Sequence, residues 1–228
     1  MRIRLAIFDM VGTTVQAGNE VPSSLREAFQ PVGVTLSDDA ISQIRGRSKR
    51  DAISHLLSKH LQGSAETAEQ VDLVFTRFQR ALRSAYQWNA QAIPGAEDVF
   101  GLLRRAQVET VLTTGLDRET AQLLFRALGW ESLGLCGLVT GDDVSRGRPA
   151  PDLIYSAMSL AGVEDSRSVA VVGDTAFDLD AAGVAKVGWS VGVLSGAHSR
   201  SQLEDHPHSV ILESIKTLPG WLREVGAL

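Results

Sequence analysis

The chain has 228 residues, of which 44% are apolar, so it can bury the core of one large domain or of two smaller ones. A formal net charge of −5 argues against a nucleic-acid-binding surface, and we find no long apolar run or signal-peptide pattern that would indicate a membrane protein. The single cysteine excludes an internal disulfide and is typical of a reducing compartment. We therefore expect a cytoplasmic protein that binds neither nucleic acid nor membranes.

The first informative segment, Leu5 to Thr14 (LAIFDMVGTT), predicts a buried parallel strand followed by a turn. Asp9 comes at the carboxyl end of this strand, where open α/β sheets bind their ligands. Gly12 permits a sharp turn, whose N–H groups can face an anion. The segment therefore suits the binding and attack of a phosphoryl group, although an aspartate that only caps the turn would give the same pattern.

The residues that follow, from 18 to 88, have helical periodicity and no convincing strand. Pro22 opens a first helix, Ser37 caps a second and Ser48 begins a third. A longer amphipathic helix comes next, and its apolar face is formed by Val71, Val74, Phe75, Phe78 and Leu82. The segment 89–95, which ends in Ile-Pro-Gly, is expected to be the linker that returns the chain from these helices to the part that contains the first strand.

Beyond this linker, strands and helices alternate. The strand candidates are 108–113, 137–140, 169–172, 189–193 and 210–212, and the helix candidates between them are 118–128, a segment after Pro151, and 178–183. Such alternation favours an α/β fold with a doubly wound parallel sheet. We predict a Rossmann-like core domain formed by residues 1–16 and 92–228. A helical cap domain, residues 17–91, is inserted after the first strand, in the position of a lid.

A second strand ends in an acidic residue. Asp174 follows the apolar run 169–172, and Asp178 comes four residues later, near the start of a helix. These carboxylates, with Asp9 and the backbone carbonyl of Val11, are the hard oxygen ligands that Mg²⁺ prefers. Helix capping by acidic residues is the alternative explanation for both positions.

Two further residues complete a possible phosphate site. Thr114 follows a third strand and offers a hydroxyl to a phosphoryl oxygen, and Arg148 supplies a cation just before a proline-started helix. Taken singly, they are an ordinary strand-end threonine and an ordinary surface arginine. Next to several carboxylates and a phosphate, however, a cation is required by electrostatics.

These features occur in a characteristic order, namely Asp9-x-x-Gly-Thr, Thr114, Arg148 and Gly-Asp174-x-x-x-Asp178. The chain thereby resembles the haloacid dehalogenase-like hydrolases over essentially its whole length. The resemblance implies a Mg²⁺-dependent hydrolase in which the first aspartate becomes an aspartyl-phosphate that water then hydrolyses.

The same resemblance implies roles for individual residues. Asp9 would be the nucleophile, Thr114 a phosphate ligand and Arg148 the group that stabilises charge. The implied metal ligands are Asp9, Val11, Asp174 and Asp178, and the expected substrate contacts are Gly12, Thr13, Lys49 and Gly115.

Val11 departs from most phosphatases of the family, which have a second aspartate there as general acid and base. A valine cannot transfer a proton, and losing such a group typically costs about 10²–10⁴ in rate. The phosphonoacetaldehyde hydrolases, or phosphonatases, have a small apolar residue at this position. Their segments also resemble 113–115, 142–144, 147–149 and 172–175 of this chain.

The phosphonatase resemblance suggests a role for Lys49. In that family a cap lysine condenses with the substrate aldehyde, and the protonated imine accepts the electrons of the broken carbon–phosphorus bond as an enamine. The neighbouring Arg45, Arg47 and Arg50 are expected to lower the pKa of Lys49. A lysine that only grips a substrate anion, or one that is simply solvated, remains an alternative.

The resemblance is incomplete at Ala52 and Leu116, where phosphonatases have a histidine and an aromatic residue. We predict a phosphonatase-like hydrolase that acts on a small phosphonate or phosphate metabolite, as a monomer or homodimer. The alternatives are a phosphomonoester phosphatase of the phosphoglycolate phosphatase type and a non-catalytic phosphate-binding protein.

Overall fold

The computed structural model describes residues 2–60 and 67–228. Within these residues, a single parallel sheet has the strand order β3-β2-β1-β4-β5-β6. Its strands are β1 (Leu5–Asp9), β2 (Glu109–Thr113), β3 (Gly137–Val139), β4 (Val169–Gly173), β5 (Trp189–Val193) and β6 (Val210–Leu212). The predicted α/β fold with a doubly wound parallel sheet is confirmed, and the predicted strand ends differ from the observed ones by at most one residue.

Helices account for most of the remaining chain. They are α1 (Glu20–Phe29), α2 (Asp38–Ser42), α3 (Lys49–His60), α4 (Ala68–Asn89), α5 (Ala96–Arg105), α6 (Arg118–Ala127), α7 (Asp152–Leu160), α8 (Ala176–Ala185), α9 (Arg200–Glu204) and α10 (Leu218–Glu224). Across the described ranges, none of them has the length and apolar character needed to cross a membrane.

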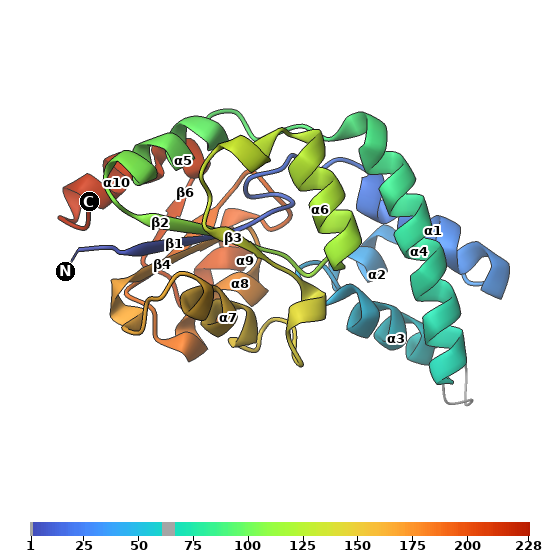
Figure 1. The fold of residues 1–228 in the computed structure, drawn as a ribbon. Helices are drawn as coiled ribbons and strands as arrows, with labels where there is room; N and C mark the ends of the chain where they lie inside the picture. Colours follow the sequence, from blue (N-terminus) through green and yellow to red (C-terminus); the bar gives the residue numbers. More distant parts are fainter. Residues whose placement is uncertain (1, 61–66) are drawn as a thin grey trace.

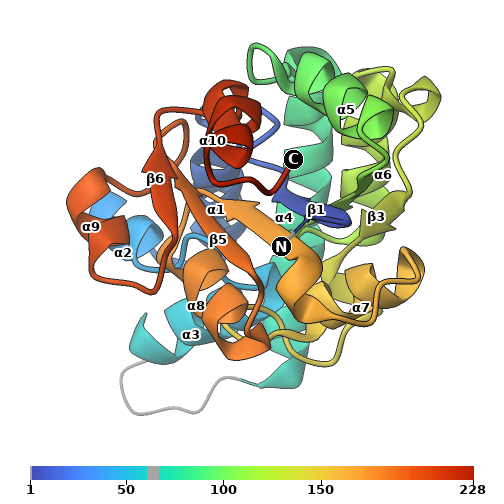
Figure 2. The same ribbon diagram turned by 90° about the vertical axis from the view of Figure 1, so that its left-hand side faces the viewer.

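Successive side chains of β1 point to opposite faces of the sheet and pack into two separate hydrophobic cores. Leu5 and Ile7 pack with residues of α7 and α8 on one face of the sheet. Ala6 and Phe8 belong to a larger cluster on the other face, which includes residues of α5 and α10. Figure 2 shows this layering, with α5 and α10 above the sheet and α7 and α8 below it. All five residues of β1 are buried, so the strand is held rigidly at the centre of the fold.

Helices α1–α4 form a separate group beyond the carboxyl ends of the strands, whereas both chain termini lie on the opposite side of the sheet (Figure 1). This group follows β1 directly in the sequence, as predicted. Helix α1 begins at Glu20 rather than at Pro22, so the proline is the third residue of the helix. A proline is tolerated there because the backbone N–H groups of a first helical turn have no partner within the helix. The assignment of residues 17–91 to a separate domain stays a prediction.

The three central strands end level with one another. Asp9, the last residue of β1, is paired in register with Thr113 at the end of β2, and Phe8 is paired with Val172 of β4. Asp174 therefore follows the next strand end at the same edge of the sheet. Residues that are more than a hundred positions apart in the sequence are brought to one edge, below helices α1–α4.

Candidate active site

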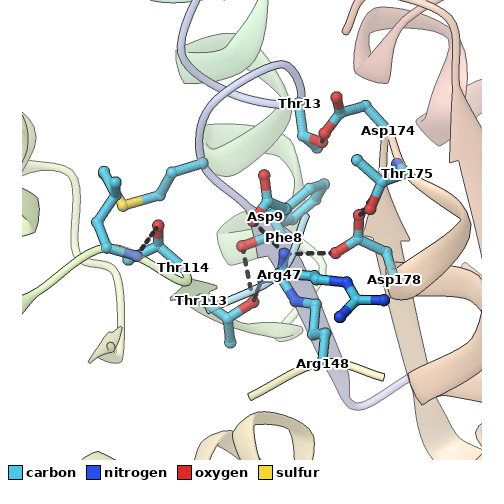
Figure 3. Close-up of polar contacts among 12 residues, drawn as sticks. Phe8, Asp9, Thr13, Arg47, Thr113, Thr114, Arg148, Asp174, Thr175 and Asp178 are labelled. Carbon is cyan, nitrogen blue, oxygen red and sulfur yellow. Dashed lines mark hydrogen bonds and ion pairs between the residues drawn. The ribbon is translucent and has the colours of Figure 1, made fainter. Parts of the chain in front are cut away.

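An arginine joins two of the predicted acidic residues. Arg148 is buried, and its Nη1 lies 2.7 Å from Asp9 Oδ1 and 2.7 Å from Asp178 Oδ1 (Figure 3). Its Nη2 donates a hydrogen bond to Thr113 Oγ1 at 3.2 Å. Charged groups are stable in such a buried position only when they are paired and hydrogen-bonded. The structure therefore places Arg148 as a fixed cation beside Asp9, and not as a solvated surface charge.

Asp174 is held by a second set of contacts. Its Oδ2 accepts a hydrogen bond from the backbone N–H of Ala197 at 2.7 Å, and its Oδ1 accepts one from Thr13 Oγ1 at 3.2 Å. Glycines line two sides of the carboxylate: a Cβ on Gly12 would lie 2.3 Å from Oδ2, and one on Gly196 only 2.0 Å away. No side chain other than hydrogen fits at either position while Asp174 stays where it is.

Asp178 caps a helix, which is the alternative explanation that its position in the sequence allowed, and it also pairs with Arg148. Its Oδ2 accepts hydrogen bonds from the backbone N–H of Thr175 at 3.0 Å and from Thr175 Oγ1 at 2.6 Å, which caps helix α8. Its Oδ1 is the partner of Arg148. In this geometry Asp178 caps α8 and holds Arg148, and direct metal ligation by it stays a prediction.

Most of the predicted site residues share the lining of one cavity at the edge of the sheet. The lining includes Asp9, Val11, Lys49, Thr114, Gly115, Arg148 and Asp174. The other predicted residues lie immediately behind it: Gly12 and Thr13 against Asp174, and Asp178 against Arg148. The structure thus brings the sequence-predicted residues together at one place.

Thr114 is oriented by the turn that follows β2. Its Oγ1 accepts a hydrogen bond from the backbone N–H of Leu116 at 3.2 Å, which leaves the hydroxyl hydrogen available for an acceptor in the cavity. Gly115 lies against the loop before α3, since a Cβ there would be 3.1 Å from the carbonyl oxygen of Arg47. This turn therefore forms both part of the cavity wall and part of the contact with the helical group.

Lys49 is a cationic residue that the helical group brings to the cavity. It is the first residue of α3, and its Nζ donates a hydrogen bond to the carbonyl oxygen of Arg47 at 3.2 Å. Burial lowers the pKa of Lys49 from 10.5 to about 8, even though the charge of Asp9 acts in the opposite direction. Lys49 is therefore no simple solvated charge, and about a tenth of its amine is unprotonated at pH 7.

The expected cause of this low pKa was wrong. After burial, the cation that lowers the pKa of Lys49 is Arg148, from the loop before α7, and not the neighbouring arginines. Arg50 forms an ion pair with Asp72 and lies over the ring of Phe75. The side chains of consecutive residues point in different directions at the start of a helix. The charges of the arginines next to Lys49 in the sequence are therefore not brought close to its amine.

The loop that carries Lys49 is seated directly on the sheet edge. Gly46 has a φ of +84°, which favours glycine, and a Cβ there would lie 2.5 Å from Thr175 Oγ1. The guanidinium of Arg47 lies over the ring of Phe177 at 5.3 Å, and Ser48 packs where a side chain on Gly147 would be. These contacts fix the first turn of α3 over the cavity.

The charges at this edge suit a metal ion. Burial raises the pKa of both Asp9 and Asp174. The negative charge of Asp178 raises both further; Arg148 opposes this at Asp9, and the charge of Asp9 adds to it at Asp174. No group of three or more His, Cys, Asp or Glu side chains is placed to hold a metal within residues 2–60 and 67–228. Two carboxylates, the carbonyl of Val11, phosphoryl oxygen and water form a set that Mg²⁺ accepts, because it keeps several waters when bound by protein. The residues present therefore fit this ion.

The fold, the buried aspartate at the end of β1 and the arginine that pairs with it are those expected of a haloacid dehalogenase-like hydrolase. The chain matches the family described as haloacid dehalogenase-like hydrolase over residues 3–186, and it belongs to this family. The enzyme class predicted from the four motifs is thereby confirmed.

Individual relatives show which members of this family the chain is similar to. A phosphonoacetaldehyde hydrolase from Bacillus cereus is 29% identical over 206 residues, which cover 86% of this chain and 78% of that protein. A hydrolase from Pseudomonas syringae has 27% sequence identity and a TM-score of 0.88, and the match covers 99% of this chain and 100% of that one. A phosphonoacetaldehyde hydrolase like protein from Oleispira antarctica shares the fold, with a TM-score of 0.89 at 20% identity over 99% and 93% of the two chains. The predicted resemblance to the phosphonatase-like branch is confirmed.

Gly196→Ala is expected to lower the rate of phosphate release by about 10–100-fold and to raise the Mg²⁺ concentration needed for half-maximal rate. The new Cβ would displace the Asp174 carboxylate or the loop whose Ala197 N–H holds it. A Mg²⁺ titration of phosphate release measures both effects. Gly220→Ala is the matched control, because nothing lies within 4 Å of its Cβ position. An unchanged Mg²⁺ requirement in Gly196→Ala would show that the position of Asp174 is not critical.

The cavity also includes residues that were not predicted as part of the site, and Tyr86 and Ala197 are two of them. Tyr86 lines it from α4, and Ala197 lines it from the loop after β5. Tyr86 lies four residues after Leu82 and so continues the apolar face of that helix, which gives no sign of a polar function. Ala197 acts through its backbone N–H, which leaves no mark on the sequence; only its place after another strand end could have suggested it.

Proposed function

We propose that this protein is a Mg²⁺-dependent hydrolase that forms an aspartyl-phosphate on Asp9 and cleaves the carbon–phosphorus bond of a small phosphonate aldehyde. Phosphonoacetaldehyde is the first substrate to test. The observation that carries the proposal is the position of Lys49: an amine with a pKa of about 8 lines the same cavity as the buried Asp9. We further propose that residues 17–91 act as a cap on the core domain 1–16 and 92–228, and that the enzyme works in the cytoplasm.

The groups around Asp9 support nucleophilic attack on phosphorus. Arg148 holds one oxygen of Asp9 and keeps its positive charge where the phosphoryl oxygens would gather negative charge. Thr114 has a hydroxyl hydrogen free to donate to one of those oxygens. Asp9, Asp174 and the Val11 carbonyl would hold Mg²⁺, which supplies further positive charge against the phosphoryl group.

Lys49 provides a path for the bonding electrons. Its free amine would condense with the aldehyde, releasing water and giving a protonated imine. Attack by Asp9 then forms the oxygen–phosphorus bond while the carbon–phosphorus pair passes into the imine as an enamine. Protonation at carbon gives the imine of acetaldehyde, and water releases acetaldehyde from Lys49 and phosphate from Asp9. No leaving oxygen needs a proton in this sequence, so Val11 is tolerated at its position.

A phosphomonoester phosphatase is the competing function, because a protonated Lys49 can also grip a substrate anion. Phosphate release from phosphonoacetaldehyde and from a phosphomonoester panel that includes 2-phosphoglycolate separates the two. We expect the aldehyde to be the preferred substrate by kcat/KM. Brisk ester turnover with none of the aldehyde would overturn the proposal in favour of the phosphatase.

The pH dependence has opposite signs in the two cases. Imine formation needs the free amine, whose fraction rises about tenfold between pH 7 and pH 9 for a pKa of about 8. We therefore expect kcat/KM for phosphonoacetaldehyde to rise by a similar factor over this range. If Lys49 only grips an anion, the protonated form is required and kcat/KM falls over the same interval. Steady-state phosphate release between pH 6 and pH 9.5 measures the sign.

A further inference from the structure

Two buried oxygen atoms in the helical group have no hydrogen-bond partner among the described residues. One is the hydroxyl of Tyr86 on α4, whose side chain is only 1% exposed, and the other is Oε2 of Glu20, the first residue of α1. An unpartnered buried polar atom lowers the stability of the folded protein, so a pair of them calls for an explanation. Neither atom has been given a function by the mechanism above.

Tyr86 belongs to the wall of the cavity that contains Asp9, and Glu20 lies behind that wall, against Gly18. Tyr86 lines this cavity directly, and so does Gly18, against which the Glu20 carboxylate is folded: a Cβ on Gly18 would lie 2.5 Å from Oε2. Acidic residues in a first helical turn often bind the free backbone N–H groups there. Oε2 makes no such bond, so helix capping does not account for it.

The charges near Tyr86 keep its hydroxyl protonated. Burial raises the pKa of Tyr86 well above its ordinary value, and the negative charges of Glu20 and Asp9 raise it further. Lys49 and Arg45 also line the cavity, but neither forms a described hydrogen bond or ion pair with Tyr86. The Tyr86 hydroxyl therefore keeps its hydrogen and is an unpartnered hydrogen-bond donor, and Glu20 Oε2 is an unpartnered acceptor.

We propose that Tyr86 and Glu20 form a subsite for the non-phosphoryl end of the substrate, with Tyr86 donating a hydrogen bond to an oxygen there and Glu20 accepting one from a hydroxyl. The class of ligand is a small phosphonate or phosphate whose far end carries an uncharged oxygen function, such as an aldehyde, its hydrate or an alcohol. This inference rests on the proposed function, because it assumes that the phosphoryl group lies at Asp9.

A pair of ligands that differ by one hydroxyl tests the subsite. 2-Hydroxyethylphosphonate and ethylphosphonate both lack the aldehyde that cleavage requires, and their dissociation constants can be measured by calorimetry with Mg²⁺ present. We expect the wild-type protein to bind the hydroxylated ligand about five- to tenfold more tightly, the usual net value of one hydrogen bond. Tyr86→Phe should bring this ratio to about one, and Glu20→Gln should reduce it less.

The chain offers a close control. It contains only two tyrosines, and the second, Tyr155 on α7, is 49% exposed. Tyr155→Phe should keep the wild-type ratio. After incorporation of 3-fluorotyrosine, the ¹⁹F resonance that disappears in Tyr86→Phe is assigned to Tyr86. This resonance should shift when 2-hydroxyethylphosphonate is added and much less when ethylphosphonate is added. The Tyr155 resonance should respond to neither ligand. This readout would not change if Tyr86 served only to pack the helices.

The outcomes separate this inference from the proposed function. If phosphonates do not bind, the KM values of 2-hydroxyethyl phosphate and ethyl phosphate are compared instead. A ratio of these KM values that changes in Tyr86→Phe then supports the subsite, even though the proposed cleavage of phosphonates is wrong. Equal affinity for both members of both pairs, or an unchanged ratio in Tyr86→Phe, overturns the subsite even if phosphonoacetaldehyde is cleaved.

Discussion

Replacing Lys49 with arginine is expected to lower the cleavage of phosphonoacetaldehyde by at least about 10³-fold. Arginine keeps a cation at the start of α3 but has no amine that can condense with an aldehyde, and its guanidinium is not deprotonated in proteins. Without the imine, the electrons of the carbon–phosphorus bond have no acceptor, and the loss is of the size that removal of a covalent catalyst causes. Phosphate release measured under single-turnover conditions gives the factor directly.

Lys49→Met and Lys59→Met complete this experiment. Lys49→Met removes the cation as well, so it should lose aldehyde cleavage and any anion gripping together. Lys59 is on the same helix and donates to Gln43 Oε1 away from the cavity, so its replacement should leave the rate unchanged. Borohydride added during turnover should ethylate Lys49, as mapped by peptide mass. If Lys49→Arg retains most of the aldehyde cleavage, or if borohydride leaves Lys49 unmodified, imine catalysis is excluded.

Asp9→Asn is expected to abolish phosphate release, with a loss of at least about 10⁴-fold for every substrate. An amide oxygen is a poor nucleophile, and a residue that forms the covalent intermediate has no substitute in the cavity. The result should be the same for phosphonates and phosphate esters, unlike that of Lys49→Arg. Phosphate release, together with a search for phosphorylated enzyme by intact-protein mass, measures both the rate and the intermediate.

The fold should survive this substitution. The pKa of Asp9 is raised by burial, so its ionised form is less favourable in the folded protein than in the unfolded chain, and this penalty applies above that pKa. A neutral asparagine removes the penalty, and Arg148 keeps Asp178 as its partner. We therefore expect Tm at neutral pH to be unchanged or higher. Asp205→Asn, on the surface, serves as the control, and an active Asp9→Asn enzyme would remove Asp9 as nucleophile.

The sequence predicted the sheet and the acidic edge because both depend on local patterns. A buried strand that ends in an acidic residue is visible in the apolar runs before Asp9 and Asp174, and parallel strands must bring such ends to one edge. Lys49 has no such local signal; it was found because its segment resembles that of a family, and its position in the same cavity as Asp9 is now observed. Its catalytic role, like those of Thr114 and Arg148, stays a prediction that the experiments above test.

Other features could not be predicted because they depend on tertiary contacts. The low pKa of Lys49 depends on burial and on Arg148, which is 99 residues away in the sequence, and not on the adjacent arginines. Tyr86 follows an apolar helical face without interruption, so periodicity alone assigns it to the core. Its unpartnered hydroxyl becomes informative only when α4 is placed beside the cavity.

The seating of the Gly46–Ser48 loop on the sheet edge has a consequence for proton balance. Lys49 reaches the cavity because its own backbone rests there, and enclosure is the main reason why its amine is a weak base. Any lifting of this loop returns the amine to water and therefore toward its ordinary basicity, so it takes up a proton as it leaves. By the reciprocity of linked equilibria, acidic solution favours the lifted arrangement and alkaline solution favours the seated one.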